Sequence, residues 1–349
     1  MNSQKEMSIL NVNKINPVGG GSTITIAGIA SVTSSVTAPS FVGSVTGNVT
    51  GNVTGNVTGD ATGLSGNPSI NTSGIVTATS FVPTVGQLSH RNIIVNGAMT
   101  VAQRGTSSTS TGYQTIDRIK QTYGGTDEAP TYAQVDVASG TTPYTQGFRK
   151  ALKITNGNQT GVLVVVIKLN LIYKIEAQDM ASSGWNYKSS SSFVTLSFWV
   201  KSSVSQNFNG YILSLDGTTQ NFPFETGTLT ADTWTKITKT IPGNSNIDFN
   251  NDNGEGLRLV LNQFLGTDQT GSVSLNAWAA FSGSTRTPNQ TSTWYTTNDA
   301  TWEITGLQLE VGPVATPFEH RSYGDELQRC RRYYQVLVDQ AGGTSQKSL

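Results

Sequence analysis

The clearest pattern of apolar and polar positions is a four-residue repeat, Thr-Gly-Asn-Val, which runs between Phe41 and Gly66. Written as an extended strand, the repeat places valine and glycine on one face and threonine and asparagine on the other, because successive side chains alternate sides. A helix is disfavoured, since each glycine costs about 1 kcal/mol relative to alanine inside a helix. The repeat therefore predicts β structure with one apolar face.

One strand of this kind cannot bury its own apolar face. Ordering a residue costs roughly 1–2 kcal/mol, whereas each repeat supplies a single valine, worth about 1.5–3 kcal/mol when fully buried. We expect the neighbours to be other copies of the chain, most simply three strands around an axis. The valines of this predicted trimeric shaft are Val45, Val49, Val53 and Val57. The alternative is a flexible, glycine-rich linker.

The patterning divides the chain into four parts. Residues 1–40 hold short alternating segments, and residues 41–90 hold the repeat and a hinge. For residues 91–320 the pattern predicts a globular β-sandwich, because many short strand-like segments follow one another at intervals of roughly 8–12 residues or slightly more. The expected strands are 116–123, 131–137, 148–155, 161–169, 193–201, 209–215, 233–241, 256–264, 272–280 and 301–311, with a helical turn at 175–181.

Residues 321–349 predict a short helix followed by a tail. Ser322 is a suitable N-cap, and Asp325 and Glu326 stand in the first turn, where negative charge complements the helix dipole. The last residues from Gly342 are expected to form a loose tail.

Composition narrows the range of partners. The 349 residues include 22 Lys and Arg and 22 Asp and Glu, and charged residues make up only 13% of the chain. A chain without net charge lacks the excess positive charge that attracts nucleic acid or an anionic membrane. We therefore expect no nucleic-acid binding and no membrane insertion. A surface rich in hydroxyls and amides suits sugars. The single cysteine, with no apolar leader at the start, predicts synthesis in a reducing cytoplasm.

Catalytic and metal-binding patterns are scarce. Two histidines and one cysteine exclude most metal and thiol designs. The stretch 248–255 is similar to a calcium loop, but its glycine falls one place late and Leu259 stands where a glutamate belongs. We therefore predict no enzyme, no cofactor and no metal. The carboxylates that could in principle pair for glycan cleavage are Asp216, Glu225, Asp232 and Glu303.

Aromatic residues fall into two groups. Trp199, Trp234 and Trp302 lie within strand patterns and are expected in the core. The others border segments rich in amides and hydroxyls, where a ring can stack on a sugar while amides bind its hydroxyls. The predicted receptor or glycan contacts are Trp185, Tyr187, Trp278, Trp294 and Tyr295. The alternative is that these rings anchor long loops.

Several segments resemble a known family. They are NIIVNGAM at 92–99, AQRGT at 102–106, TLSFWVKS at 195–202, ITGLQLEVG at 304–312 and ATPFEHRSYGDEL at 315–327. Together they resemble the jelly-roll, carbohydrate-binding-module-like domain in tail fibres of marine phages, cyanophages especially, and the Thr-Gly-Asn-Val repeat is also similar to cyanophage fibres. The resemblance implies an all-β chain with a trimeric β shaft, a jelly-roll sandwich and a short C-terminal helix.

The resemblance also implies a function, that of a non-enzymatic tail fibre in the virion. Residues 1–40 would attach to other tail or baseplate proteins, and residues 91–320 would engage a host-surface glycan or lipopolysaccharide. Two other classes stay open. One is a purely structural connector that serves as a platform for another virion protein, and the other is a depolymerase that cleaves surface glycan.

Overall fold

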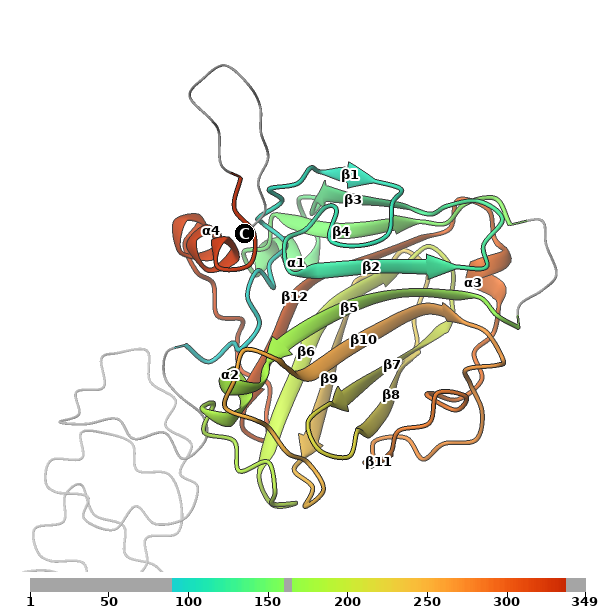
Figure 1. Ribbon diagram of the computed structural model, residues 1–349. Coiled ribbons are helices and arrows are strands. Elements are labelled where there is room, and N and C mark those ends of the chain that lie inside the picture. The colour runs from blue at the N-terminus through green and yellow to red at the C-terminus, as the bar shows by residue number, and fades with distance from the viewer. Residues whose placement is uncertain (1–89, 160–164, 337–349) are drawn as a thin grey trace, which may run out of the picture. The chain divides into compact units, whose positions relative to one another are not determined.

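The computed structural model describes residues 90–159 and 165–336, drawn in colour in Figure 1. These residues belong to the second of two compact units, Ala78–Leu349. The repeat, the predicted shaft valines (Val45, Val49, Val53 and Val57) and the attachment region 1–40 lie outside the described residues.

The described residues form two six-stranded antiparallel sheets that pack face to face (Figure 1). The first sheet contains, in spatial order, β1 (Ser107–Ser108), β3 (Thr131–Asp136), β4 (Lys150–Thr155), β12 (Thr301–Val311), β6 (Phe193–Ser202) and β9 (Thr235–Pro242). The second contains β11 (Ala279–Ala280), β8 (Gln220–Thr228), β7 (Asn207–Ser214), β10 (Glu255–Leu265), β5 (Lys168–Glu176) and β2 (Ile119–Gly124). The predicted all-β, jelly-roll sandwich is confirmed.

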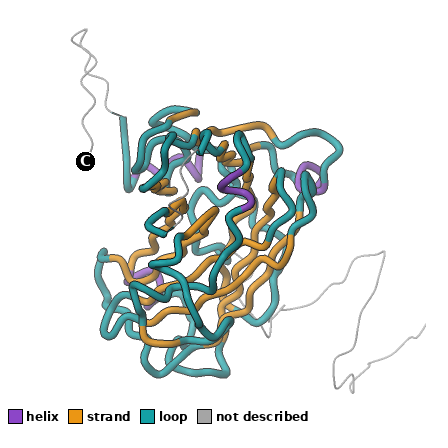
Figure 2. The backbone as a smooth tube through the Cα atoms, turned by 90° about the vertical axis from the view of Figure 1, so that its right-hand side faces the viewer, coloured by secondary structure: helices purple, strands orange, loops and turns teal. Residues whose placement is uncertain are grey.

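The helices of the described residues are short, as the tube in Figure 2 shows. They are α1 (Thr142–Thr145), α2 (Ala177–Ala181), α3 (Thr293–Thr296) and α4 (Tyr323–Arg331). The predicted C-terminal helix is confirmed with its cap, because the backbone N–H of Asp325 donates to Ser322 Oγ at 3.1 Å. Arg329 and Arg331 in the last turn complete the charge pattern that the dipole favours.

The main core lies between the two sheets and follows the alternation of the strands. On β10, Leu257, Leu259 and Leu261 point into it, and Leu171 and Tyr173 do so on β5. The residues that alternate with these along each strand must therefore point away from the core. This alternation fixes which side chains share the outer face of the second sheet.

Two of the three expected core tryptophans are buried. Trp302 lies in the main core, whereas Trp199 packs on Phe148 in a smaller cluster. Trp234 is half-buried beside Lys201, whose Nζ lies 5.3 Å from the ring centre.

Three strand predictions need correction. The predicted strand 161–169 lies outside the described residues up to 164, and its described part is strand only from Lys168, where β5 begins; Val166, part of the apolar run, is 57% exposed. The stretch 272–280 is loop apart from β11. Strand β8 was missed because Pro223 and a glycine interrupt its pattern. Proline is tolerated there because it lies near the sheet edge, where its carbonyl accepts from the Asn276 N–H at 2.8 Å.

Candidate functional site

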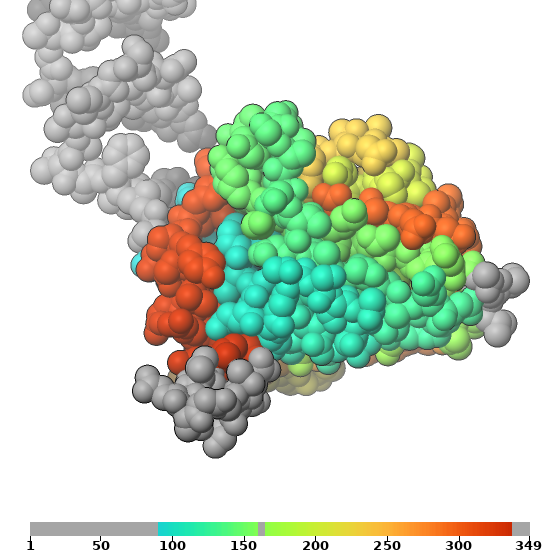
Figure 3. Space-filling view, turned by 90° about the horizontal axis from the view of Figure 1, so that it is seen from above, coloured from blue at the N-terminus to red at the C-terminus, as the bar shows by residue number. Residues whose placement is uncertain are grey.

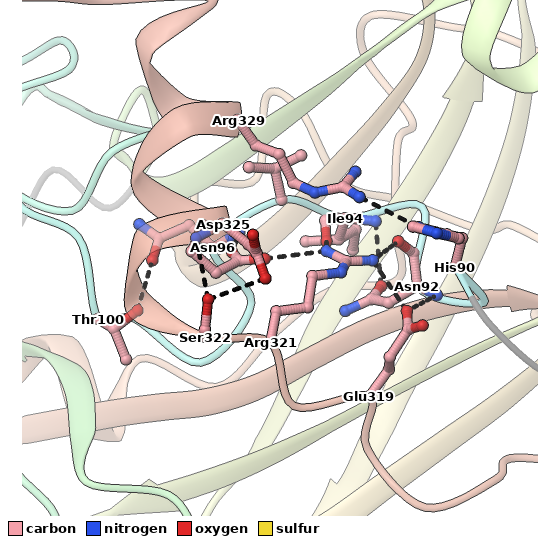
Figure 4. A network of polar contacts seen from close by, with 12 residues as sticks. His90, Asn92, Ile94, Asn96, Thr100, Glu319, Arg321, Ser322, Asp325 and Arg329 are labelled. Carbon is pink, nitrogen blue, oxygen red and sulfur yellow. Dashed lines mark hydrogen bonds and ion pairs between the residues drawn. The ribbon is translucent and has the colours of Figure 1, made fainter.

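Three of the segments that carry the family resemblance meet: 92–99, 304–312 and 315–327, and Figure 4 shows the contacts between the first and the last of them. At their centre, Arg321 Nη1 lies 3.0 Å from Glu326 Oε1 and Nη2 lies 2.9 Å from Glu319 Oε2. Arg321 Nη1 also donates to the carbonyl of Ile94 at 3.2 Å. The side-chain oxygen of Asn92 accepts backbone N–H groups from Ile94 and from β12. One arginine thus joins the first described residues to the C-terminal segment.

This network is a structural clamp. Figure 3 shows α4, in red, directly beside the first described residues, in cyan. Glu326 is buried and accepts the backbone N–H of Asn96. Gly97 is required there, because a Cβ would lie 2.0 Å from the carbonyl oxygen of Leu307. These three segments are therefore explained by packing, and the expected domain boundary between residues 320 and 321 passes through the clamp.

Three of the five predicted glycan contacts are buried, which is a correction to the sequence prediction. Trp294 and Tyr295 of α3 are 0% and 1% exposed, and Trp185 is 3% exposed. Trp294 Nε1 donates to the carbonyl of Thr301 at 3.0 Å, and Tyr295 stacks on Phe264 with ring centres 4.9 Å apart. These rings anchor loops, because aromatic side chains with a satisfied polar atom are stable inside a core.

The other two predicted contacts are half-buried. Tyr187 packs edge-on against Phe249, with ring centres 4.8 Å apart. Trp278 packs on Phe222 and donates from Nε1 to the carbonyl of Pro242 at 2.7 Å. Because Trp185, Trp294 and Tyr295 are buried, the five predicted residues do not form one exposed binding surface.

A different surface gathers polar side chains: the outer face of the second sheet, defined as the side of β2, β5, β10 and β7 that points away from the core. In Figure 1, β5 and β10 lie in front of β12 and β6, so this face is toward the viewer. Strand register places its side chains in three transverse rows. Cross-strand neighbours in a row have Cβ atoms about 4.5–5.5 Å apart.

The first row is made of amides. Asn262 of β10 lies opposite Asn170 of β5 on one side and Asn209 of β7 on the other, and Thr122 of β2 continues the row. All three asparagines are buried, whereas Thr122 is half-buried. We call this set the amide row.

The second row is apolar. Val260 lies opposite Ile172 on β5 and opposite Tyr211 on β7, and Lys120 of β2 ends the row. Tyr211 and Val260 form a small cluster on this face, separate from the main core. Ile172 and Lys120 are half-buried and therefore partly open to solvent.

The third row is charged. Arg258 lies opposite Lys174, and Glu255 pairs with both: its Oε2 lies 2.6 Å from Lys174 Nζ and its Oε1 lies 2.5 Å from Arg258 Nε. Burial alone would raise the pKa of Glu255, but hydrogen bonds from Arg258 and Lys174 outweigh it and lower the pKa below its usual range. We call Arg258 and Lys174 the charged row.

A strap, residues 284–290, borders the face along β7 and β8. Asn209 Nδ2 donates to the carbonyl of Pro288, and Asn221 Nδ2 donates to the carbonyl of Arg286, both at 2.8 Å. Because two side chains of the sheet hold the strap's backbone, it forms a fixed wall on this side of the face.

The amide row contains polar groups without partners. Neither amide atom of Asn262 has a hydrogen-bond partner among the described residues, although the residue is 1% exposed. Neighbouring Gln263 is in the same state, and Oδ1 of Asn221 is also unpaired. Most buried polar groups are hydrogen-bonded, and each unpaired one costs about 1–3 kcal/mol. Water or ligand hydroxyls could supply the missing bonds, and a ligand reaches the closed-off amide of Asn262 only if neighbouring side chains move.

Sequence reasoning missed this face, although a signal was present. Asparagine is depleted in strands, yet β5, β7 and β10 each contain at least one. Asparagines at the polar positions of several strands could have identified the outer face as a candidate binding surface.

Catalytic and metal chemistry has little support in the described part of the chain. Glu303 of the first sheet pairs with Lys201 at 3.0 Å, whereas Glu225 belongs to β8 in the second sheet. Asp216 accepts from Asn250, and Asp232 is exposed. Among the described residues, no group of three or more His, Cys, Asp or Glu could hold a metal ion. The same residues include no helix long and apolar enough to cross a membrane.

Comparison with known proteins gives remote likenesses only. No protein-family model matches the sequence, and no curated protein matches it. Among solved structures, the chain is similar to the enzymatically active domain of tailspike protein 4 of bacteriophage CBA120, with 10% identity and a TM-score of 0.31 over 63% of this chain and 21% of that one. The chain thus spans about a fifth of the length of that solved chain.

Two other solved structures resemble the domain. The N-terminal cellulose-binding domain of a Cellulomonas fimi glucanase has 10% identity and a TM-score of 0.29, covering 62% of this chain and 100% of that one. The baseplate tripod of bacteriophage Tuc2009 has 13% identity and a TM-score of 0.27, covering 70% of this chain and 62% of that one. Because all these scores are low, the function of this chain is inferred from its own residues.

Proposed function

We propose that this protein is a non-enzymatic phage tail-fibre subunit that binds a host-surface glycan through the outer face of its second sheet. The observation that carries the proposal is the unpaired, buried amide of Asn262 at the centre of the amide row. Side-chain amides bind sugar hydroxyls in both directions, since each amide has two donors and an acceptor. The apolar row beside it offers surface for the C–H groups of a sugar ring.

The arrangement supports an elongated ligand. The rows run across the strands, so a chain of sugars lying along them would contact β2, β5, β10 and β7 in turn. The half-buried residues Lys120, Thr122 and Ile172 form the accessible part of the face, and the strap closes its β7–β8 side. Because the strands fix these side chains in register, the face is preorganised for binding.

The remaining parts of the proposal come from the sequence. Residues 1–40 attach the fibre to tail or baseplate proteins of the virion, and the repeat forms a homotrimeric shaft after synthesis in the host cytoplasm. Light scattering of the full chain tests the trimer. Val53→Asp should disrupt it because three carboxylates would meet near one axis, and Thr54→Asp on the opposite face should not. A monomeric wild type would favour the linker alternative.

The glycan-binding function is tested by an array of host and bacterial glycans probed with the full chain and with Asn262→Ala. We expect a set of glycans to bind the wild type and to lose binding in the variant, with an unchanged melting temperature. Lys236→Gln, an exposed position on β9 of the first sheet, is the matched control. Equal binding by Asn262→Ala would contradict the proposal. Binding to a virion protein without any glycan binding would instead favour the structural connector.

A further inference from the structure

A hollow of about 550 Å³ lies at the end of the second sheet, where β5 and β10 meet the residues after α4. Its lining includes Arg118, Lys174, Glu176, Glu255, Arg332 and Tyr333. Lys174 belongs to both the hollow and the charged row, so the hollow is continuous with the outer face. Any ligand lying across the rows can reach into it.

Positive charge exceeds negative charge at this end of the face. Four cationic side chains (Arg118, Lys174, Arg258 and Arg332) stand against three carboxylates: Glu176, Glu255 and Asp179, whose charge interacts with Arg118 and Arg332. Over the whole sequence the positive and negative residues balance at 22 each, so the excess is local. A concave site lined by charge of one sign attracts ligands of the opposite sign.

Both glutamates of the hollow are already paired with cations. Glu176 makes a two-pronged pair with Arg332, at 3.0 Å from Nε and 2.6 Å from Nη2, and Glu255 is shared by Lys174 and Arg258. The pair with Arg332 lowers the pKa of Glu176 to about 2, so this carboxylate stays charged and occupied at neutral pH. Neither glutamate is left to neutralise Arg118.

Arg118 is held in an unusual position. Its φ is +74°, a left-handed conformation that a non-glycine residue seldom adopts, and such outliers gather at functional sites. Its guanidinium carbon lies 3.4 Å from the ring centre of Tyr333, and Nη2 donates to the carbonyl of Lys174. Nε has no hydrogen-bond partner among the described residues, and Arg118 has no ion-pair partner there either. Arg118 thus brings a stacked, permanently charged group to the wall of the hollow, although its buried Nε is not itself open to a ligand.

We infer that this end of the site recognises an anionic saccharide, one whose sugars carry carboxylates as uronic acids do. The inference rests on the proposed glycan-binding function and adds the class of glycan. The guanidinium fork of an arginine matches a carboxylate in geometry and forms charge-assisted hydrogen bonds with it. The charged row lies four residues from the amide row along each strand, about 13 Å at 3.3 Å per residue, so an oligosaccharide is needed to touch both.

The test is calorimetric titration of the full chain with an oligogalacturonate and with the same oligosaccharide as its methyl ester, which lacks the charge. We expect the acid to bind at least about tenfold more tightly, the usual effect of one charge-assisted hydrogen bond. Arg118→Gln and Lys174→Gln should each lower affinity for the acid and leave affinity for the ester unchanged. Lys236→Gln, with the same loss of charge on the first sheet, should change neither.

The outcomes separate this inference from the proposed function. Equal affinity for the acid and the ester would overturn the inference, and so would unaltered binding of the acid by both charge variants. In either case the proposed glycan binding would still hold if Asn262→Ala weakens the binding of both oligosaccharides. Failure of both probes would overturn recognition of carboxylated sugars, and the glycan array then decides the function separately. Arg118→Lys keeps the positive charge but loses the planar guanidinium. We therefore expect its affinity for the acid to lie between those of the wild type and Arg118→Gln, even if the packing on Tyr333 is disturbed.

Discussion

Arg321 and Glu326 form a buried ion pair, with side chains 9% and 8% exposed, at the place where α4 meets the first described residues. Both are also hydrogen-bonded to the backbone of residues 94 and 96. Removing one partner of a buried pair leaves the other charge uncompensated, which costs about 3–5 kcal/mol. We therefore expect Arg321→Ala to lower the free energy of unfolding by that amount in denaturant titrations.

The matched control for that variant is an exposed ion pair. Lys150 and Asp136 pair across β4 and β3 with side chains 39% and 81% exposed. Lys150→Ala should cost less than about 1 kcal/mol, because exposed pairs are weak. Similar losses in the two variants would show that the clamp does not depend on burial.

The same contacts predict the limits of a stable fragment. Residues 90–336 should melt in a single cooperative transition with a β-type circular dichroism spectrum. Residues 90–320 should melt at a clearly lower temperature, because Glu326 and Cys330 are buried against the rest of the domain. Equal melting temperatures would show that α4 does not stabilise the domain, as the predicted boundary between residues 320 and 321 implied.

Trp294→Ala should destabilise the domain and leave the affinity of the folded fraction for glycan unchanged. The ring is fully buried, and truncating a buried aromatic side chain typically costs about 3–5 kcal/mol. Trp278→Ala, at a half-buried ring, should cost less. Chemical unfolding and glycan-array binding, measured on the same samples, separate the two effects. Weaker binding without loss of stability would show that Trp294 contacts the receptor.

The pair between Glu176 and Arg332 predicts a dependence on acid. The pKa of Glu176 falls from 4.5 to about 2 in the folded state, because Arg332 hydrogen-bonds the charged carboxylate. A carboxyl group with a lowered folded pKa contributes stability above its unfolded pKa and loses it as the pH falls from about 4.5 to about 2. In Glu176→Gln, the melting temperature should depend less on pH over that range. An unchanged acid profile would contradict this role.

Local signals predicted most of the fold. The cap at Ser322 and the alternation of β10 depend on neighbouring residues, so both could be read directly from the sequence. The buried position of Trp294 could not, because hydroxyl- and amide-rich residues around it also suit a surface loop. Whether that loop turns inward depends on the contact of Tyr295 with Phe264, 31 positions away in the chain.

The candidate site was less predictable for the same reason. Alternation alone indicates that Asn262 and Arg258 share a face of β10. It does not indicate that Asn170 and Asn209 lie opposite Asn262, because that register joins three strands distant in sequence. The amide row is therefore a property of long-range pairing, and only the unusual choice of asparagine in each strand was visible beforehand.

The clamp also has a mechanical consequence. The backbone of Ile93 donates to the carbonyl of Leu309, and Leu307 donates to the carbonyl of Gly97, so this segment lies along β12 on the side that β4 leaves after Ile304. A pull along the chain from residue 90 would load both bonds and Arg321 together, in shear, before it reached the outer face of the second sheet. We therefore expect tension to be taken up by these contacts, and the three rows of the second sheet to be spared distortion.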